Sequence, residues 1–242
     1  MKEPRRRLLA ALPVVAFSVF TAHSTAAADP AGATAPTGYG FVSKSADFAL
    51  YQKTSAGSSD LIAFRGIGTL AATPIEVATG ILDRVHRPTW MRDVQNLRTV
   101  RVLGPGHFVE YSGVKTPFIV KNRDFVIRTD VEVDLPHAKI LIVSRSVEDA
   151  DAPPTDAVRG KLTEGRFLIE PGSAPGTTRL TADMDVDPMG SCPRWIVNAF
   201  QKNWPVAMFN GLKWFLTKKI ATLPEDLRPL FTTAASTVPA GK

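Results

Sequence analysis

The sequence feature that most constrains the fold is a long series of segments in which apolar and polar residues alternate. Alternation with a period of two is typical of β-strands. The segments follow one another through turns and loops too short for the crossovers that parallel neighbours need, so antiparallel pairing is expected. The predicted strands cover residues 97–103, 107–114, 123–133, 139–147, 158–164, 165–170 and 177–186.

A single long helix is predicted after the last of these strands, over residues 193–219. Its apolar residues recur with the 3.6-residue period of an α-helix and occupy most of the circumference, with Phe200 and Met208 among them. A helix of this kind must be covered on several sides. The economical arrangement is an α+β fold in which the antiparallel sheet curls around the terminal helix.

Upstream of residue 97, the sequence predicts a short helix over 45–53, a strand over 61–70 and a second helix that begins near residue 73. Thr73 is a typical N-cap residue, Pro74 suits the first helical position and Glu76 completes a capping box. Apolar residues follow at helical spacing, at Val77, Ile81, Leu82 and Val85.

The first 28 residues have the three parts of a secretory signal peptide. A basic start is followed by an apolar run over 8–20, shorter than the roughly 20 residues of a membrane span, and then by three consecutive Ala residues. Cleavage before Asp29 and a periplasmic or secreted location are expected, and an uncleaved anchor is the alternative. The predicted layout is a signal peptide (1–28), a flexible leader (29–44), one domain (45–224) and a polar tail (225–242).

The charge of the mature chain argues against binding to nucleic acid. The full sequence has 29 basic and 23 acidic residues. Removing residues 1–28 takes away four basic residues and one acidic residue, so the mature chain has a net charge of 25 − 22 = +3. A nucleic-acid surface needs clustered Lys and Arg on one face, and this chain does not show such a cluster. Cys192 is the single cysteine, so no intrachain disulfide can form.

Motifs for bond-making chemistry are missing from the sequence. The His residues of the mature chain do not share a metal-ligand spacing, and no phosphate loop or nucleophile elbow occurs. Asp183, Asp185 and Asp187 resemble the start of a calcium loop but lack its later residues, so they are interpreted as the wet face of a strand. Arg123–Asp124 has no catalytic partners and is interpreted as a structural corner. No catalytic residue, metal or cofactor is predicted.

Five stretches, in this order, resemble the START family of lipid-binding domains (steroidogenic acute regulatory protein-related lipid transfer). They are ATPIEVATGILDRVHRPTWMRDV, which contains an Arg-x-x-Trp sequence, VKTPFIVKNRDFV, LIVSRSVEDADAPPTDAVRG, GRFLIEPG and DVDPMGSCPRWIVNAFQKN. The resemblance implies a helix-grip fold, in which a curved antiparallel sheet holds the C-terminal helix around an internal hydrophobic tunnel. The residues expected to bind the ligand there are Glu110, Ser112, Phe125, Ile127, Thr129, Val131, Phe200 and Met208.

One departure from the family bears on the ligand. Members that bind sterols or phosphatidylcholine carry a tunnel arginine six residues after the arginine of the Arg-Asp motif, and here that position is Thr129. Arg128, one residue earlier, is expected to point outward with Val126 and Asp130, because neighbours in a strand face opposite sides. Without a buried cation, desolvating a phosphate costs several kcal/mol. A sterol, hopanoid or fatty-acyl ligand is therefore expected, with Glu110 either holding its hydroxyl together with Thr129 or lying solvated at an edge.

The resulting hypothesis is an exported monomer that carries one weakly polar lipid through the periplasm and contacts membranes transiently. The C-terminal helix and a neighbouring loop would loosen to admit the ligand, with Pro205 and Gly211 as weak points of the helix. Three alternatives stay open. They are a phospholipid-binding START protein, a helix-grip enzyme that uses Glu110, and a ligand-free module whose core is filled by residues such as Phe167 and Phe200.

Overall fold

The computed structural model describes residues 36–56, 61–91, 93–116 and 119–232, except for the side chains of 194–196 and 198–202. The predicted signal peptide, residues 29–35 of the predicted leader and the last ten residues lie outside this part of the chain. The strands are β1 (Gly40–Lys44), β2 (Phe48–Thr54), β3 (Ile62–Leu70), β4 (Val94–Gly104), β5 (His107–Val114), β6 (Arg123–Asp134), β7 (Lys139–Ser146), β8 (Val158–Arg159), β9 (Lys161–Pro171) and β10 (Thr178–Asp187). The helices are α1 (Pro74–Leu82), α2 (Arg87–Trp90), α3 (Arg194–Leu216), the 3-10 turn η1 (Glu225–Leu227) and α4 (Arg228–Thr232).

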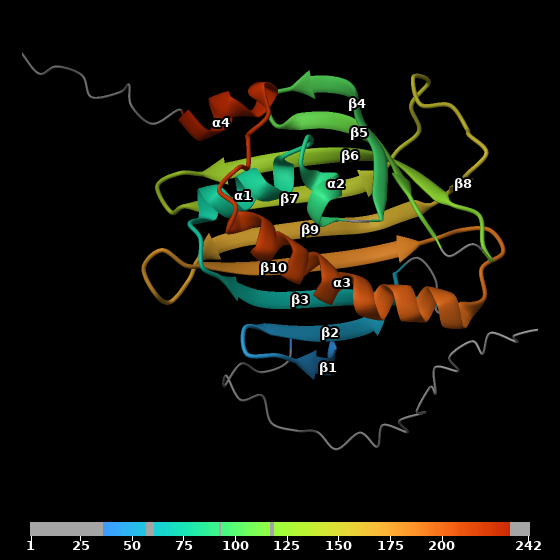
Figure 1. The fold of residues 1–242 in the computed structure, drawn as a ribbon, viewed down its shortest axis with the longest axis horizontal. Helices are drawn as coiled ribbons and strands as arrows, with labels where there is room; N and C mark the ends of the chain where they lie inside the picture. Colours follow the sequence, from blue (N-terminus) through green and yellow to red (C-terminus); the bar gives the residue numbers. More distant parts are fainter. Residues whose placement is uncertain (1–35, 57–60, 92, 117–118, 233–242) are drawn as a thin grey trace, which may run out of the picture. The chain divides into compact units, whose positions relative to one another are not determined.

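The strands form one sheet in the order β1-β2-β3-β10-β9-β7-β6-β5-β4, and β8 adds a short parallel pairing to β6 (Figure 1). Every pairing along the main order is antiparallel. The antiparallel sheet with a C-terminal helix that the sequence predicts is therefore confirmed. The two segments predicted as separate strands over 158–164 and 165–170 are instead mostly one strand, β9, because Gly165 continues the pairing to Ser144 and Met184.

The N-terminal edge of the sheet corrects two predictions. Residues 40–44, assigned to the leader, form β1, and 45–53, predicted as a helix, contains most of β2. The apolar residues of β2 serve both faces of a strand: Phe48 and Leu50 are buried in the main core, while the ring of Tyr51 lies edge-on to Phe41 of β1. A strand with apolar residues on both faces does not show the alternation of apolar and polar residues that is typical of a strand. Its sequence can therefore be mistaken for that of a helix.

Helix α1 has the predicted start and an earlier end than its apolar pattern suggests. Thr73 and Glu76 form the expected capping box, with Pro74 in the first turn. The helix stops at Leu82 because the side chain of Asp83 accepts hydrogen bonds from the backbone of the following turn. Val85, counted as part of the apolar stripe, is consequently 75% exposed.

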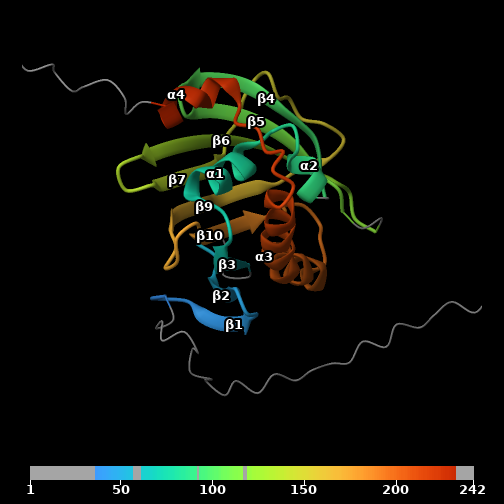
Figure 2. The same ribbon diagram turned by 60° about the vertical axis from the view of Figure 1, so that its left-hand side comes forward.

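Helices α1, α2 and α3 all pack on one face of the curved sheet (Figure 2). Helix α3 crosses β3 where Gly68 leaves room for the ring of Phe209, which also packs on Phe48 at 4.6 Å between ring centroids. The opposite side of α3 is less covered than its composition suggests, since Trp214 is half exposed. In the described part of the chain, no helix is both long and apolar enough to cross a membrane.

The segment after α3 belongs to the fold, which corrects the prediction of a polar tail from residue 225. Leu227 is fully buried in the main core, and Leu230 and Phe231 pack against it. Upstream, the backbone of Thr222 donates to Asp83 at 2.7 Å. The apolar residues at 227, 230 and 231 have helical spacing, but they are too few to stand out in a polar stretch.

Candidate functional site

The concave face of the sheet and the three helices enclose a cavity of about 720 Å³. Strands β3 to β7, β9 and β10 form its floor and sides, and α2 and α3 close it. Its wall is mainly apolar, and the apolar lining includes Ile62, Phe64, Leu82, Met91, Leu97, Phe108, Ile142, Leu162, Phe167, Met184, Val186, Val197, Trp204 and Met208. Phe167, one of the large side chains that the sequence suggested could fill the core, lines this space.

Most of the residues predicted to bind a ligand are in the cavity wall. These are Glu110, Ser112, Phe125, Ile127, Thr129 and Met208. Val131 faces the same side of β6 but is buried in the core beside the cavity, because the sheet and helices close together there. Phe200 lies in α3, and its side chain is outside the described residues.

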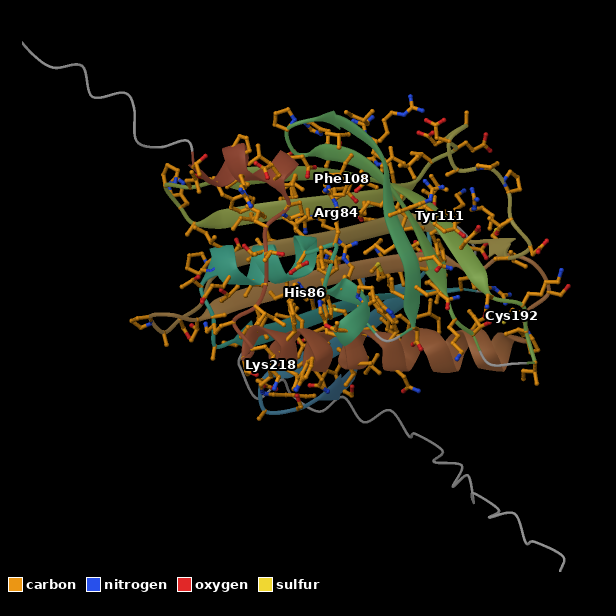
Figure 3. The ribbon with its side chains drawn as sticks, turned by 45° about the horizontal axis from the view of Figure 1, so that its top comes forward. Arg84, His86, Phe108, Tyr111, Cys192 and Lys218 are labelled. Carbon is orange, nitrogen blue, oxygen red and sulfur yellow. The ribbon has the colours of Figure 1, made fainter. Side chains whose placement is uncertain are left out.

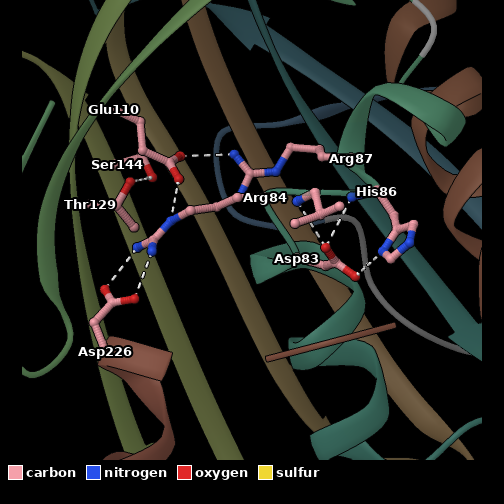
Figure 4. Close-up of polar contacts among 9 residues, drawn as sticks. Asp83, Arg84, His86, Arg87, Glu110, Thr129, Ser144 and Asp226 are labelled. Atoms are coloured by element: carbon pink, nitrogen blue, oxygen red, sulfur yellow. Dashed lines mark hydrogen bonds and ion pairs between the residues drawn. The ribbon is translucent and has the colours of Figure 1, made fainter. Parts of the chain in front are cut away.

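Glu110 is buried in the wall and holds two arginines (Figure 4). Its Oε1 accepts from Nε of Arg84 at 2.8 Å, and its Oε2 accepts from Nη1 of Arg87 at 2.8 Å. Arg84 also donates from Nη1 and Nη2 to both carboxylate oxygens of Asp226, at 2.7 and 3.0 Å. The guanidinium of Arg84 lies over the ring of Phe108, 4.3 Å from the centroid (Figure 3). Of the two positions foreseen for Glu110, the structure shows the one facing the cavity.

The side chains of Arg84, Arg87, Glu110 and Asp226, called the ion cluster below, carry two positive and two negative charges. The hydrogen bonds from Arg84 hold the pKa of Asp226 below its ordinary value, so this carboxyl is ionised at neutral pH. Burial by itself would lower the pKa of Arg84, but the two carboxylates outweigh it and raise that pKa. The expectation of a cavity without a cation is wrong, because Arg87 of α2 and Arg123 at the start of β6 both line the wall.

A pair of hydroxyl groups lies on the cavity floor near the ion cluster. Thr129 Oγ1 and Ser144 Oγ are 2.9 Å apart across β6 and β7, and both residues line the cavity. One hydroxyl proton is used between them, so the pair can still donate one hydrogen bond and accept others. Arg128 points to the opposite face, where it is exposed and donates to Asp130, as the strand alternation predicts.

Arg123 and Asp124 hold loops at the start of β6. Arg123 is buried and donates to the backbone carbonyls of Lys121, Pro188 and Met189. Asp124 is buried and accepts from Thr155 Oγ1 at 2.8 Å and from Arg159 Nε at 2.7 Å. Burial alone would raise the pKa of Asp124, but these hydrogen bonds outweigh burial and lower it. Both side chains are thus occupied by structural contacts.

The three Asp residues of β10 lie on the outer face of the sheet, but two of them are not wet. Asp183 is buried under an ion pair with Arg65, and Asp185 accepts from Ser55 Oγ. Side chains from other parts of the chain, Arg65 of β3, Arg166 of β9 and Ser55 after β2, contact these carboxylates, which the alternation of a single strand does not reveal. Among the described residues, no group of three His, Cys, Asp or Glu side chains could hold a metal ion.

At Gly211, α3 lies directly against the backbone of α2. A Cβ on Gly211 would lie 2.4 Å from the carbonyl oxygen of Trp90, so only Gly allows this contact. Gly211 is therefore a close-packing point, in contrast to the weak point that the sequence suggested. The cavity continues toward the start of α3, where Pro188 and Cys192 line it.

The sequence did not predict that Arg84, Asp226 or Ser144 belongs to the site. Arg87 was noted only as the arginine of the Arg-x-x-Trp sequence and was given no role in the cavity. Arg84 and Arg87 follow the end of α1, at a spacing that brings both side chains to the same carboxylate. Asp226 had no signal of its own, because its partner lies 142 residues earlier. Ser144 could have been found from the predicted pairing of the strands that became β6 and β7, since it lies opposite Thr129.

Comparison with known proteins supports a family assignment. The sequence profile of the START domain matches residues 41–219. Human StAR-related lipid transfer protein 13 is 30% identical over 122 residues, which are 50% of this chain and only 11% of the human protein. Bovine phosphatidylcholine transfer protein is 29% identical over 147 residues, 59% of this chain and 68% of that protein.

The fold comparison agrees with the profile match. The crystal structure of human STARD10 matches with a TM-score of 0.68 at 22% identity, over 76% of this chain and 75% of that chain. At this identity the likeness concerns the fold alone. Since the profile match spans well over half of the sequence, and the matched residues form the helix-grip sheet and helices described above, the chain belongs to the START domain family.

Proposed function

We propose that this protein binds one weakly polar lipid, such as a sterol, a hopanoid or a fatty-acyl compound, and carries it between membranes. The observation that carries the proposal is the mainly apolar cavity of about 720 Å³, whose wall includes a small number of polar groups such as Glu110, Thr129 and Ser144. Sites for single small hydrophobic molecules have volumes of about 300–1,000 Å³. Burial of the apolar part of a lipid provides affinity, about 25 cal/mol per Å² before ordering costs.

The polar region favours an uncharged head group. The ion cluster is neutral as a whole, and each guanidinium already has a carboxylate partner. Among the described residues, Arg87 Nε is buried without a hydrogen-bond partner and could donate to a phosphate, but the phosphate would then lie beside the carboxylate of Glu110. A hydroxyl or ester needs only the donor and acceptor capacity of Thr129 and Ser144. Phospholipid binding is the second candidate, and Arg87 in the cavity wall is the observation that favours it.

Binding without reaction fits the side chains of the cavity better than catalysis does. Glu110, the carboxylate that an enzyme of this fold would use, accepts a hydrogen bond from an arginine on each oxygen. A general acid or base needs a free oxygen within reach of the substrate. We therefore propose a carrier that releases its ligand unchanged.

Transport is proposed to take place outside the cytoplasm, because residues 1–28 have the pattern of a cleaved signal peptide. Transient contact with membranes by a monomeric carrier is part of the same proposal. Ile119 and Met189 are each about half exposed, and they adjoin Val120 and Pro188 of the cavity wall. Apolar side chains at this position could enter the interfacial layer of a bilayer while a lipid is exchanged.

Native mass spectrometry of the mature protein, purified without detergent, tests the proposal. A lipid at one copy per protein is expected, and solvent extraction would identify it. Ile127→Trp should fill the cavity and remove this lipid, while Arg128→Trp, on the opposite face of the same strand, should leave it bound. A protein that carries no lipid and takes none from vesicles would refute lipid binding. A bound phospholipid would refute the weakly polar ligand and favour the second candidate.

A further inference from the structure

Asp226 is joined to the cavity wall although it lies beyond the matched part of the family. The family match ends at residue 219, and Asp226 lies in η1. Its two oxygens accept from Arg84, and the Nε of the same guanidinium donates to Glu110, which lines the cavity (Figure 4). Arg84 is thus shared between a carboxylate of the cavity and a carboxylate of the C-terminal segment.

Packing holds the carboxylate of Asp226 in place. The next residue, Leu227, is fully buried in the main core. On the other side, Thr222 donates to Asp83 from its backbone nitrogen at 2.7 Å and from its hydroxyl at 3.3 Å. The contact with Arg84 is therefore fixed by the segment around it, unlike a surface ion pair between two mobile side chains.

The charge of Asp226 decides whether the ion cluster is neutral. With it, the ion cluster has two positive and two negative groups. Without it, the sum is +1, and two guanidinium donors of Arg84 lose their partner next to Phe108, which lines the cavity. The side chains of Arg84 and Asp226 are only 16% and 21% exposed, so solvent screens this charge weakly. An unbalanced charge in such surroundings acts over several ångströms without direct contact.

We propose that Asp226 is a determinant of ligand charge: by balancing Arg84, it makes the cavity accept uncharged lipids and reject lipids with an anionic head group. The inference rests on the proposed lipid binding and adds the residue that sets selectivity. Asp226 does not touch the ligand, so it acts as a positioning and charge-balancing residue. A phosphate or carboxylate group in the wild-type cavity would lie next to the carboxylate of Glu110, and Asp226 would already balance the charge of Arg84 behind it.

The test compares two lipids that differ only in a phosphate group. The protein is incubated with vesicles that contain equal amounts of monooleoylglycerol and monooleoylglycerol phosphate, and the bound ratio is measured by mass spectrometry after re-isolation. Wild type is expected to take up mostly the uncharged lipid. Asp226→Asn should raise the ratio of phosphate to uncharged lipid by about tenfold or more. Asp226→Glu, which keeps the charge, should restore the wild-type ratio.

Two further variants separate local charge from other effects. Glu225→Gln makes the same change in the net charge of the protein at the neighbouring residue, whose side chain is 87% exposed, and should leave the ratio unchanged. Arg84→Gln combined with Asp226→Asn returns the cluster to zero and should return the preference for the uncharged lipid. Arg84→Gln alone leaves −1 and should reduce uptake of the phosphate below that of wild type, which tests the inference even if Asp226→Asn does not fold.

Two results would overturn the role of Asp226 and leave lipid binding intact. One is a ratio of phosphate to uncharged lipid in Asp226→Asn that equals the wild-type ratio. The other is a ratio in the double variant that is as high as in Asp226→Asn alone. Uptake of neither lipid by the wild-type protein would overturn the inference together with the proposed ligand class. Preference of the wild type for the phosphate would overturn the inference but support lipid binding.

Discussion

The contact between α2 and α3 makes an unusual prediction about a glycine in a helix. Gly211 lies inside α3, where replacement of Gly by Ala normally stabilises a helix by about 1 kcal/mol. Here the new methyl group would lie 2.4 Å from the carbonyl oxygen of Trp90, which is 0.6 Å less than the 3.0 Å that real Cβ contacts respect. The obstacle is backbone, so the two helices must separate.

The balance of these two effects gives the expected magnitude. Overpacking of this kind costs about 1–3 kcal/mol. Gly211→Ala should therefore lower the free energy of unfolding by up to about 2 kcal/mol after the gain in helix propensity, and lower the Tm by up to about 8 °C for a domain of this size. Because Gly211 and Trp90 also line the cavity, the separation should speed up exchange of the bound lipid.

Gly80→Ala in α1 is the matched control. Its methyl group would lie 3.2 Å from Cδ1 of Leu212 and from Cδ2 of Leu216, which are ends of flexible side chains that can move by a few tenths of an ångström. This variant should be as stable as wild type or gain up to about 1 kcal/mol. Urea unfolding monitored by circular dichroism measures both variants. A Gly211→Ala protein as stable as Gly80→Ala would show that the close contact of α2 and α3 does not exist in solution.

Three other variants test separate parts of the fold. Leu227→Ala should cost about 2–4 kcal/mol in urea unfolding, since this side chain is fully buried; an unchanged stability would mean that the C-terminal segment is not part of the core. Thr73→Ala removes the N-cap of α1 and should cost about 0.5–2 kcal/mol by the same assay, a loss that Thr73→Ser should avoid. Asp124 has a lowered pKa in the folded protein, so its contribution to stability is present above about pH 4 and lost as the pH falls through the lowered value. Between pH 6 and pH 3, the free energy of unfolding should therefore fall less steeply with pH in Asp124→Asn than in wild type. Parallel pH profiles of the two proteins would contradict the role of the contacts that Asp124 makes with Thr155 and Arg159.

The sequence by itself determined the parts of the structure that depend on local patterns. Alternation along β6 put Phe125, Ile127 and Thr129 on the inner face and Arg128 on the outer face, because successive side chains of a strand point to opposite sides. The capping box of α1 was equally clear, because its hydrogen bonds join residues three positions apart. Local rules failed at β2, whose apolar residues serve both faces, and at Leu227, in a segment too short to show a period.

Only the tertiary structure decided which charges meet and what space remains. Glu110 pairs with an arginine 26 residues earlier in the chain, and that arginine pairs with a carboxylate 142 residues later. No periodicity links such positions, because their distance depends on how the sheet curls and where the segment after α3 returns. The cavity likewise depends on the packing of all its walls at once: a shift of one ångström between helix and sheet would fill or open it. Strand and helix preferences act over a few residues, whereas ligand selectivity arises from charges brought together by the whole fold.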